Sequence, residues 1–140
     1  MTMVRFRMFR ISVPQFAIIS KEVEPSYNIK TDTDIKNTAD GSAVAITMTF
    51  SFLGKAETAM ILQVMCEFII HPDDLKNLSS EGKIIIDKKT LEHFLVHTVG
   101  TARGILHCKT EGTPFNVVIL PPMNVTGIIT KDLIIELPKE

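Results

Sequence analysis

The chain has 140 residues, a formal net charge of −1 and 45% hydrophobic residues. This length predicts one domain that buries its core without disulfides or metal ions. The near-neutral charge excludes the basic surface of a nucleic-acid-binding protein, because Arg5, Arg7 and Arg10 form only a short cluster. The mean hydropathy of +0.21 is high for a chain without a membrane-length apolar run. Apolar surface is therefore expected to remain for subunit interfaces or binding grooves.

The cysteines and the N-terminus predict a cytoplasmic protein. Cys66 and Cys108 provide neither a disulfide framework nor a zinc-finger spacing. Residues 1–7 alternate polar and apolar side chains and lack the apolar segment of a signal peptide. We therefore expect reduced thiols, no export of this chain and no insertion into a membrane.

The first half of the chain begins with two weaker strand patterns. Residues 3–11 and 15–19 form an extended pair interrupted at Pro14, which predicts a sheet edge or a bend. A loop over 22–26 leads to a second strand, 27–36, whose apolar and threonine side chains share one face. A turn at residues 37–41 follows.

The third and fourth strands carry the clearest alternation. Residues 43–53 place every second apolar side chain on one face, and residues 57–71 continue this pattern after a tight turn. In the fourth strand the other face is also partly apolar, at Ile61, Met65 and Ile69. Antiparallel sheets normally leave one face to water, so these side chains indicate a second contact surface.

A long helix follows a short irregular region. Pro72 can start a helical turn, residues 77–82 form a polar loop, and the apolar run 83–86 is compatible with more than one state. Asp87 is a suitable N-cap for a helix that ends near Lys109.

This helix has two unusual sides. When the residues are placed on a helix at about 100° per residue, mostly apolar side chains form one broad stripe, which predicts contact with the sheet. Its members are Leu91, Phe94, Leu95, Thr98, Val99, Ala102, Ile105 and Leu106. The opposite side carries His93, Val96, His97, Gly100, Gly104 and His107. Each glycine costs the helix roughly 1 kcal/mol relative to alanine. We therefore predict that a second subunit covers this charge-poor side and approaches closely at the glycines.

A proline-punctuated connection, 112–124, leaves the helix, and residues 125–137 form a short helix or strand. The predicted fold class is α+β, with one domain spanning 1–140. It has a four-stranded antiparallel sheet, a long helix on one face, a Pro-rich connection and a short C-terminal element.

The order of these elements resembles the protein-export chaperone SecB. The pair Ala102-Arg103 is similar to the Ala-Arg in the long helix of that family. The connection follows the spacing of the family segment Phe-Pro-x-Leu-x-Leu-x-Pro-x-Asn-Phe. The matching residues are Phe115, Val118, Leu120, Pro122 and Asn124, with Asn116 in place of proline and Val125 in place of phenylalanine.

The resemblance implies a chaperone that holds unfolded or non-native polypeptides in hydrophobic grooves without ATP. It implies sheets that pair into dimers and long helices that join two dimers, so the partner predictions include a homo-tetramer or dimer. The family docks on the translocase motor SecA through carboxylates of its outer sheet face. Gln63 stands where the family has one of them. A dedicated partner of one protein, such as an antitoxin, is therefore an alternative.

Candidate client-binding residues are apolar and come from three segments: Phe16, Ile18, Ile61, Met65, Ile69, Leu120, Pro121, Pro122 and Met123. Flexible methionine suits a surface that accepts many sequences. Ordinary core or dimer packing is the competing interpretation for each residue.

No catalytic or cofactor site is predicted. His93 and His97 have the spacing of zinc ligands, but no third ligand accompanies them. His107 and Cys108 are helix neighbours that point about 100° apart, so they do not form a dyad. The remaining alternatives are a structural oligomeric subunit and, more weakly, a small-ligand or enzymatic domain in a cleft beside the connection.

Overall fold

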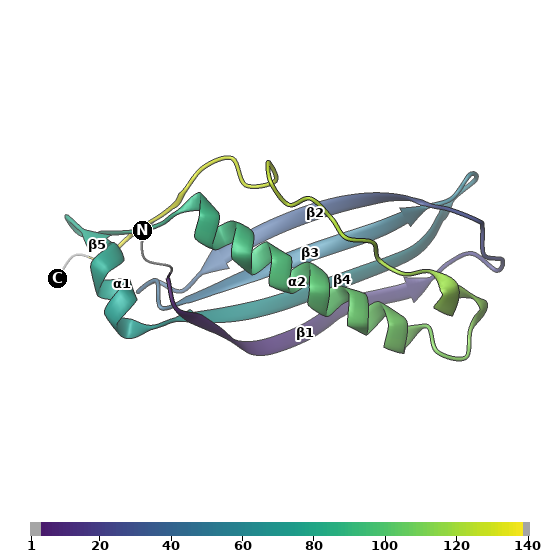
Figure 1. Cartoon of the computed structure of the whole chain (residues 1–140), viewed down its shortest axis with the longest axis horizontal. Coiled ribbons are helices and arrows are strands. Elements are labelled where there is room, and N and C mark those ends of the chain that lie inside the picture. Colours follow the sequence, from purple (N-terminus) through teal and green to yellow (C-terminus); the bar gives the residue numbers. More distant parts are fainter. Residues whose placement is uncertain (1–3, 139–140) are drawn as a thin grey trace.

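Four long strands form the main sheet of the computed structural model, which describes residues 4–138 (Figure 1). They are β1 (Phe6–Ile18), β2 (Asn28–Asn37), β3 (Ala43–Leu53) and β4 (Thr58–Ile70). Their order is β1-β4-β3-β2, with every neighbouring pair antiparallel. The predicted four-stranded antiparallel sheet is confirmed, and β1 and β2 are its two edges.

The prediction of two strands separated at Pro14 is wrong in detail, because β1 runs continuously through this residue. Its pairing with β4 shifts register between Met8 and Arg10 and again between Ser12 and Gln15. Pro14 lies within the second shift, where its missing N–H does not interrupt a regular ladder on this edge strand. Met3, the expected first residue of the strand, lies outside the described residues.

The core lies between the sheet and α2 (Lys88–Lys109), which crosses the inner face as predicted (Figure 1). Apolar side chains of β3 and β4 alternate between this buried face and a half-buried outer face. The ring of Phe94 stacks on Phe68 with centroids 4.4 Å apart and meets Phe6 edge-on at 4.7 Å. The Asp87 side chain accepts a hydrogen bond from the backbone N–H of Thr90, which confirms the predicted N-cap.

A second, smaller sheet joins two segments whose state the sequence left open. It has the order β5-β6-β7, with β5 (Ser79–Ser80), β6 (Lys83–Ile86) and β7 (Leu133–Glu136). The short helix α1 (Pro72–Leu78) precedes it and extends into the predicted loop. This sheet anchors the C-terminal end of the chain beside the start of α2.

The connection after α2 begins with the 3-10 helix η1 (Pro114–Val117) and then continues without regular structure to β7. Figure 1 shows it returning beside α2, over the β2 side of the sheet. Phe115 and Leu120 are buried and attach the connection to the core. The candidate site lies between this part of the connection and the segment that enters β2.

Candidate functional site

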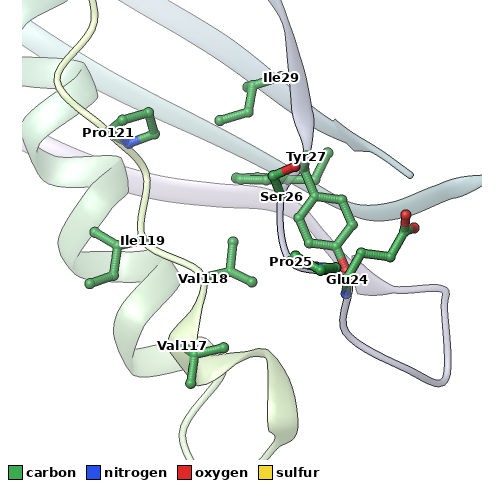
Figure 2. A pocket seen from close by; sticks show the side chains of 10 residues that line it. Glu24, Pro25, Ser26, Tyr27, Ile29, Val117, Val118, Ile119 and Pro121 are labelled. Carbon is green, nitrogen blue, oxygen red and sulfur yellow. The ribbon is translucent and has the colours of Figure 1, made fainter. Parts of the chain in front are cut away.

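A groove of about 340 Å³ lies between the entry into β2 and the connection after α2 (Figure 2). Residues 24–29 form one wall and residues 117–121 form the other, with Phe52 of β3 also contributing. Beyond Val117, the last residue of η1, the second wall is extended at Val118 and runs past the segment that leads into β2. The shape therefore suits an elongated ligand.

The wall at residues 24–29 is held in place by its own hydrogen bonds. The Tyr27 hydroxyl accepts a hydrogen bond from the backbone N–H of Glu24 at 2.7 Å, and the ring meets Phe52 edge-on at 6.5 Å. The Glu24 carboxylate accepts from the backbone N–H of Lys55 at 3.2 Å. These contacts tie the loop to the β3–β4 turn, so this side of the groove is preorganised.

The opposite wall is fixed by one arginine of α2. Arg103 Nε donates to the carbonyl oxygen of Leu120 at 2.6 Å, and its Nη2 donates to that of Pro121 at 3.1 Å. Leu120 is fully buried, whereas Val117 and Ile119 are 74% and 64% exposed. The connection is thus anchored by Leu120 and Arg103 while it presents apolar side chains to solvent.

The predicted client-binding residues of the connection lie in or next to this groove. Pro121 lines it, Pro122 is exposed and Met123 is half-buried. Leu120 instead belongs to the core with no exposed surface. Its role is to position the wall, and its side chain offers no surface to a ligand.

The other predicted residues lie elsewhere on the sheet. Ile61, Met65 and Ile69 are half-buried on the outer face, away from α2. Phe16 and Ile18 pair with Leu62 and Met60, so they lie on the inner face at the β1 edge. The structure does not bring these two groups together with the groove.

Several groove residues were not among the sequence candidates: Glu24, Pro25, Ser26, Tyr27, Ile29, Phe52, Val117, Val118 and Ile119. The run of apolar residues at 117–119, beside three prolines, was the available signal. Their exposure depends on how the connection is placed, which local patterns do not show.

Among residues 4–138, the outward side of α2 is largely open to solvent, although the His97 ring meets Phe6 edge-on at 5.6 Å. His93, Val96, His97, Gly100, Gly104 and His107 are all exposed, as the predicted subunit interface requires of a single chain. Apart from the adjacent backbone of α2, a Cβ added at Gly100 or Gly104 would meet no atom of the described residues within 4 Å. The glycines are therefore not explained by packing inside the subunit.

Other chemistry has little support in residues 4–138. They contain no group of three or more His, Cys, Asp or Glu side chains placed to hold a metal ion. Burial raises the pKa of the Cys66 thiol, which disfavours its reactive thiolate. Within the same residues, no helix is both long and apolar enough to cross a membrane.

Comparison with known proteins identifies a SecB-like fold. A SecB-like chaperone from Mycobacterium tuberculosis, solved in complex with a peptide from the HigA1 antitoxin, is similar with a TM-score of 0.53 and 13% identity. The match covers 87% of this chain and 89% of that one. A protein of unknown function from Streptococcus agalactiae has a TM-score of 0.43 and 11% identity over 79% of this chain and 90% of that one. No family model and no curated protein matches the sequence.

Proposed function

We propose that this protein is an ATP-independent cytoplasmic chaperone that holds extended apolar segments of unfolded or non-native polypeptides. The observation that carries the proposal is the exposed apolar wall at 117–121 facing the preorganised wall at 24–29. The SecB-like fold supports the same class, since the mycobacterial protein was solved with an antitoxin peptide. The proposal includes no catalysis and no cofactor.

The energetics of the groove favour an apolar client. Val117 and Ile119 expose most of their side chains to water. Fully burying an aliphatic side chain contributes about 1.5–3 kcal/mol, so covering this wall gives a useful fraction of a binding free energy. Because Arg103 and Leu120 already order the wall, little further conformational entropy is lost on binding.

We also propose that the subunits associate through two surfaces. The β1 edge carries exposed Phe9, Ile11 and Ile19, which suit sheet-to-sheet pairing into a dimer. The glycine-containing outward side of α2 would then join two dimers into a tetramer. The open space beside Gly100 and Gly104 supports close helix approach.

A dedicated partner, such as one antitoxin, is the second candidate. Gln63 replaces the family carboxylate and donates a hydrogen bond from Nε2 to Thr49 Oγ1 at 3.0 Å. The neighbouring Glu67 lies 3.6 Å from Arg10. With these contacts, the outer face of β4 is poorly suited to dock on SecA through carboxylates. A role in general export is therefore disfavoured.

The test is suppression of aggregation of two unrelated unfolded proteins, with and without ATP. The double variant Val117→Ser/Ile119→Ser should weaken holding roughly tenfold, because it removes apolar groove surface. Ile134→Ser is the matched control, since Ile134 is 58% exposed on β7 and does not line the groove.

Three results would redirect the proposal. Full holding by the double variant would show that clients bind elsewhere. Holding of one partner alone would favour the dedicated chaperone. No holding by the wild type would favour a structural oligomeric subunit.

A further inference from the structure

Among residues 4–138, β2 has no backbone partner at one of its edges. It is the last strand of the sheet, and within this part of the chain it pairs with β3 alone. Within residues 4–138, no backbone hydrogen bond joins it to the connection that passes nearby. Alternate N–H and C=O groups of β2 therefore remain available to another extended chain.

The outer face of β2 carries a regular charge pattern. Lys30, Asp32, Asp34 and Lys36 are all exposed, and they follow one another at every second position. Across the sheet they face the uncharged residues Ser51, Thr49, Thr47 and Ala45 of β3. None of the four forms an ion pair with another described residue. A strand added at the free edge could place an opposite charge directly beside each of them.

A second copy of this chain is a poor occupant. Antiparallel self-pairing centred on Thr33 would place Lys30 opposite Lys36 and Asp32 opposite Asp34. Like charges directly opposite each other destabilise a strand pair. The pattern thus disfavours self-pairing in this register. The equally long register centred on Asp32 still brings Asp32 opposite itself, whereas a complementary chain meets no like charge.

The inner face of β2 offers an apolar contact near each end. Ile29 lines the groove described above, and Ile35 lines a second hollow of about 310 Å³ with Leu91 and Ile129. These positions are six residues apart along the extended strand, or about 20 Å. Between them, the hydroxyl oxygens of Thr31 and Thr33 are buried without a hydrogen-bond partner among the described residues. A client strand with apolar ends and hydroxyl side chains between them would complement this face.

We propose that the free edge of β2 selects extended client segments whose side chains on the outer face of the sheet follow the order anion, cation, cation, anion. This inference rests on the proposed function and specifies the clients. The order Lys-Asp-Asp-Lys is the same in both directions, so a client with the complementary order fits in parallel or antiparallel orientation. Charge would therefore select the segment without fixing its direction.

Two peptides of identical composition test this selection. Both carry Leu, Thr, Thr and Leu at the inward positions. One has Glu, Lys, Lys and Glu at the outward positions, and the other has Lys, Glu, Glu and Lys. We expect the first to bind roughly tenfold more tightly at low salt, because four opposite-charge pairs replace four like-charge pairs. Fluorescence anisotropy should show the difference shrinking at high ionic strength.

The variant Lys30→Asp/Asp32→Lys/Asp34→Lys/Lys36→Asp should reverse the preference without unfolding the protein, since all four side chains are exposed. Circular dichroism checks the fold, and hydrogen exchange should show protection of β2 by the preferred peptide. Equal affinities, an unchanged preference in the variant or protection elsewhere would overturn this inference. Aggregation suppression by the same samples separates the two proposals. If clients are held without charge preference, only this inference fails, whereas loss of all holding contradicts the chaperone function itself.

Discussion

The two edges of the main sheet differ in regularity and in chemistry. β1 contains two register shifts and a proline, and it exposes Phe9 and Ile11. β2 pairs with β3 in one unbroken register and alternates charged side chains with half-buried ones. Figure 1 shows the two strands on opposite sides of the same sheet.

This difference indicates two kinds of contact. Exposed edge strands promote aggregation unless charge, proline, irregularity or a partner protects them. β2 has charge, and β1 has Pro14 and two register shifts, but β1 still exposes the apolar side chains of Phe9 and Ile11. We therefore propose that β1 forms a permanent contact between copies and that β2 forms transient contacts with clients.

The largest effect is expected from a charge on the β1 edge. Ile11 is 51% exposed, so Ile11→Lys should leave the subunit folded. Because Ile11 is already half-buried, its burial in a two-fold contact gives about half of 1.5–3 kcal/mol in each copy, so losing it in both copies weakens a dimer roughly 10- to 100-fold. Light scattering after size exclusion should show a smaller particle.

The matched control for this experiment is Asp34→Lys on the exposed outer face of β2. It also changes charge at a sheet edge and should leave the mass unchanged. If the control lowers the particle mass and Ile11→Lys does not, β2 and not β1 forms the contact between copies.

A smaller change in assembly is expected from Gly104→Leu, which isolates the β1 contact from the helix contact. No atom lies within 4 Å of the added Cβ inside the subunit, and leucine is a better helix former than glycine. The variant should therefore unfold at no lower temperature but form a dimer where the wild type forms a tetramer. Equal masses would exclude the outward side of α2 from the assembly.

Much of the fold could be predicted because local patterns determine it. Strict alternation defined β3 and β4, and the 3.6-residue period together with Asp87 defined α2. The pairing of β6 with β7 could not be found in this way. Each strand has four residues, and the pairing of Ile84 with Ile135 depends on contacts far apart in the sequence.

The candidate site was less accessible to sequence reasoning. Pro121 was identified through its segment, but Tyr27 and Ile29 looked like ordinary residues of an alternating strand. They line the groove because the connection returns over β2, and Arg103 holds it there from α2. Such tertiary placement has no local signature, so the groove required the structure.

The smallest predicted effect concerns what holds the beginning of β1. Arg5 donates hydrogen bonds from its backbone N–H, Nε and Nη2 to Asp74 of α1, and these lower the pKa of Asp74 to about 2. A depressed carboxyl pKa gives stability that is present above about pH 4 and is lost as pH falls toward 2. Solvent screens this pair through the Arg5 side chain, which is 60% exposed, so Asp74→Asn should lower the unfolding midpoint at pH 6 by only roughly 1–3 °C. The difference in unfolding midpoint between the variant and the wild type should disappear at pH 2. A difference that persists at pH 2 would show that the ion pair does not tether β1.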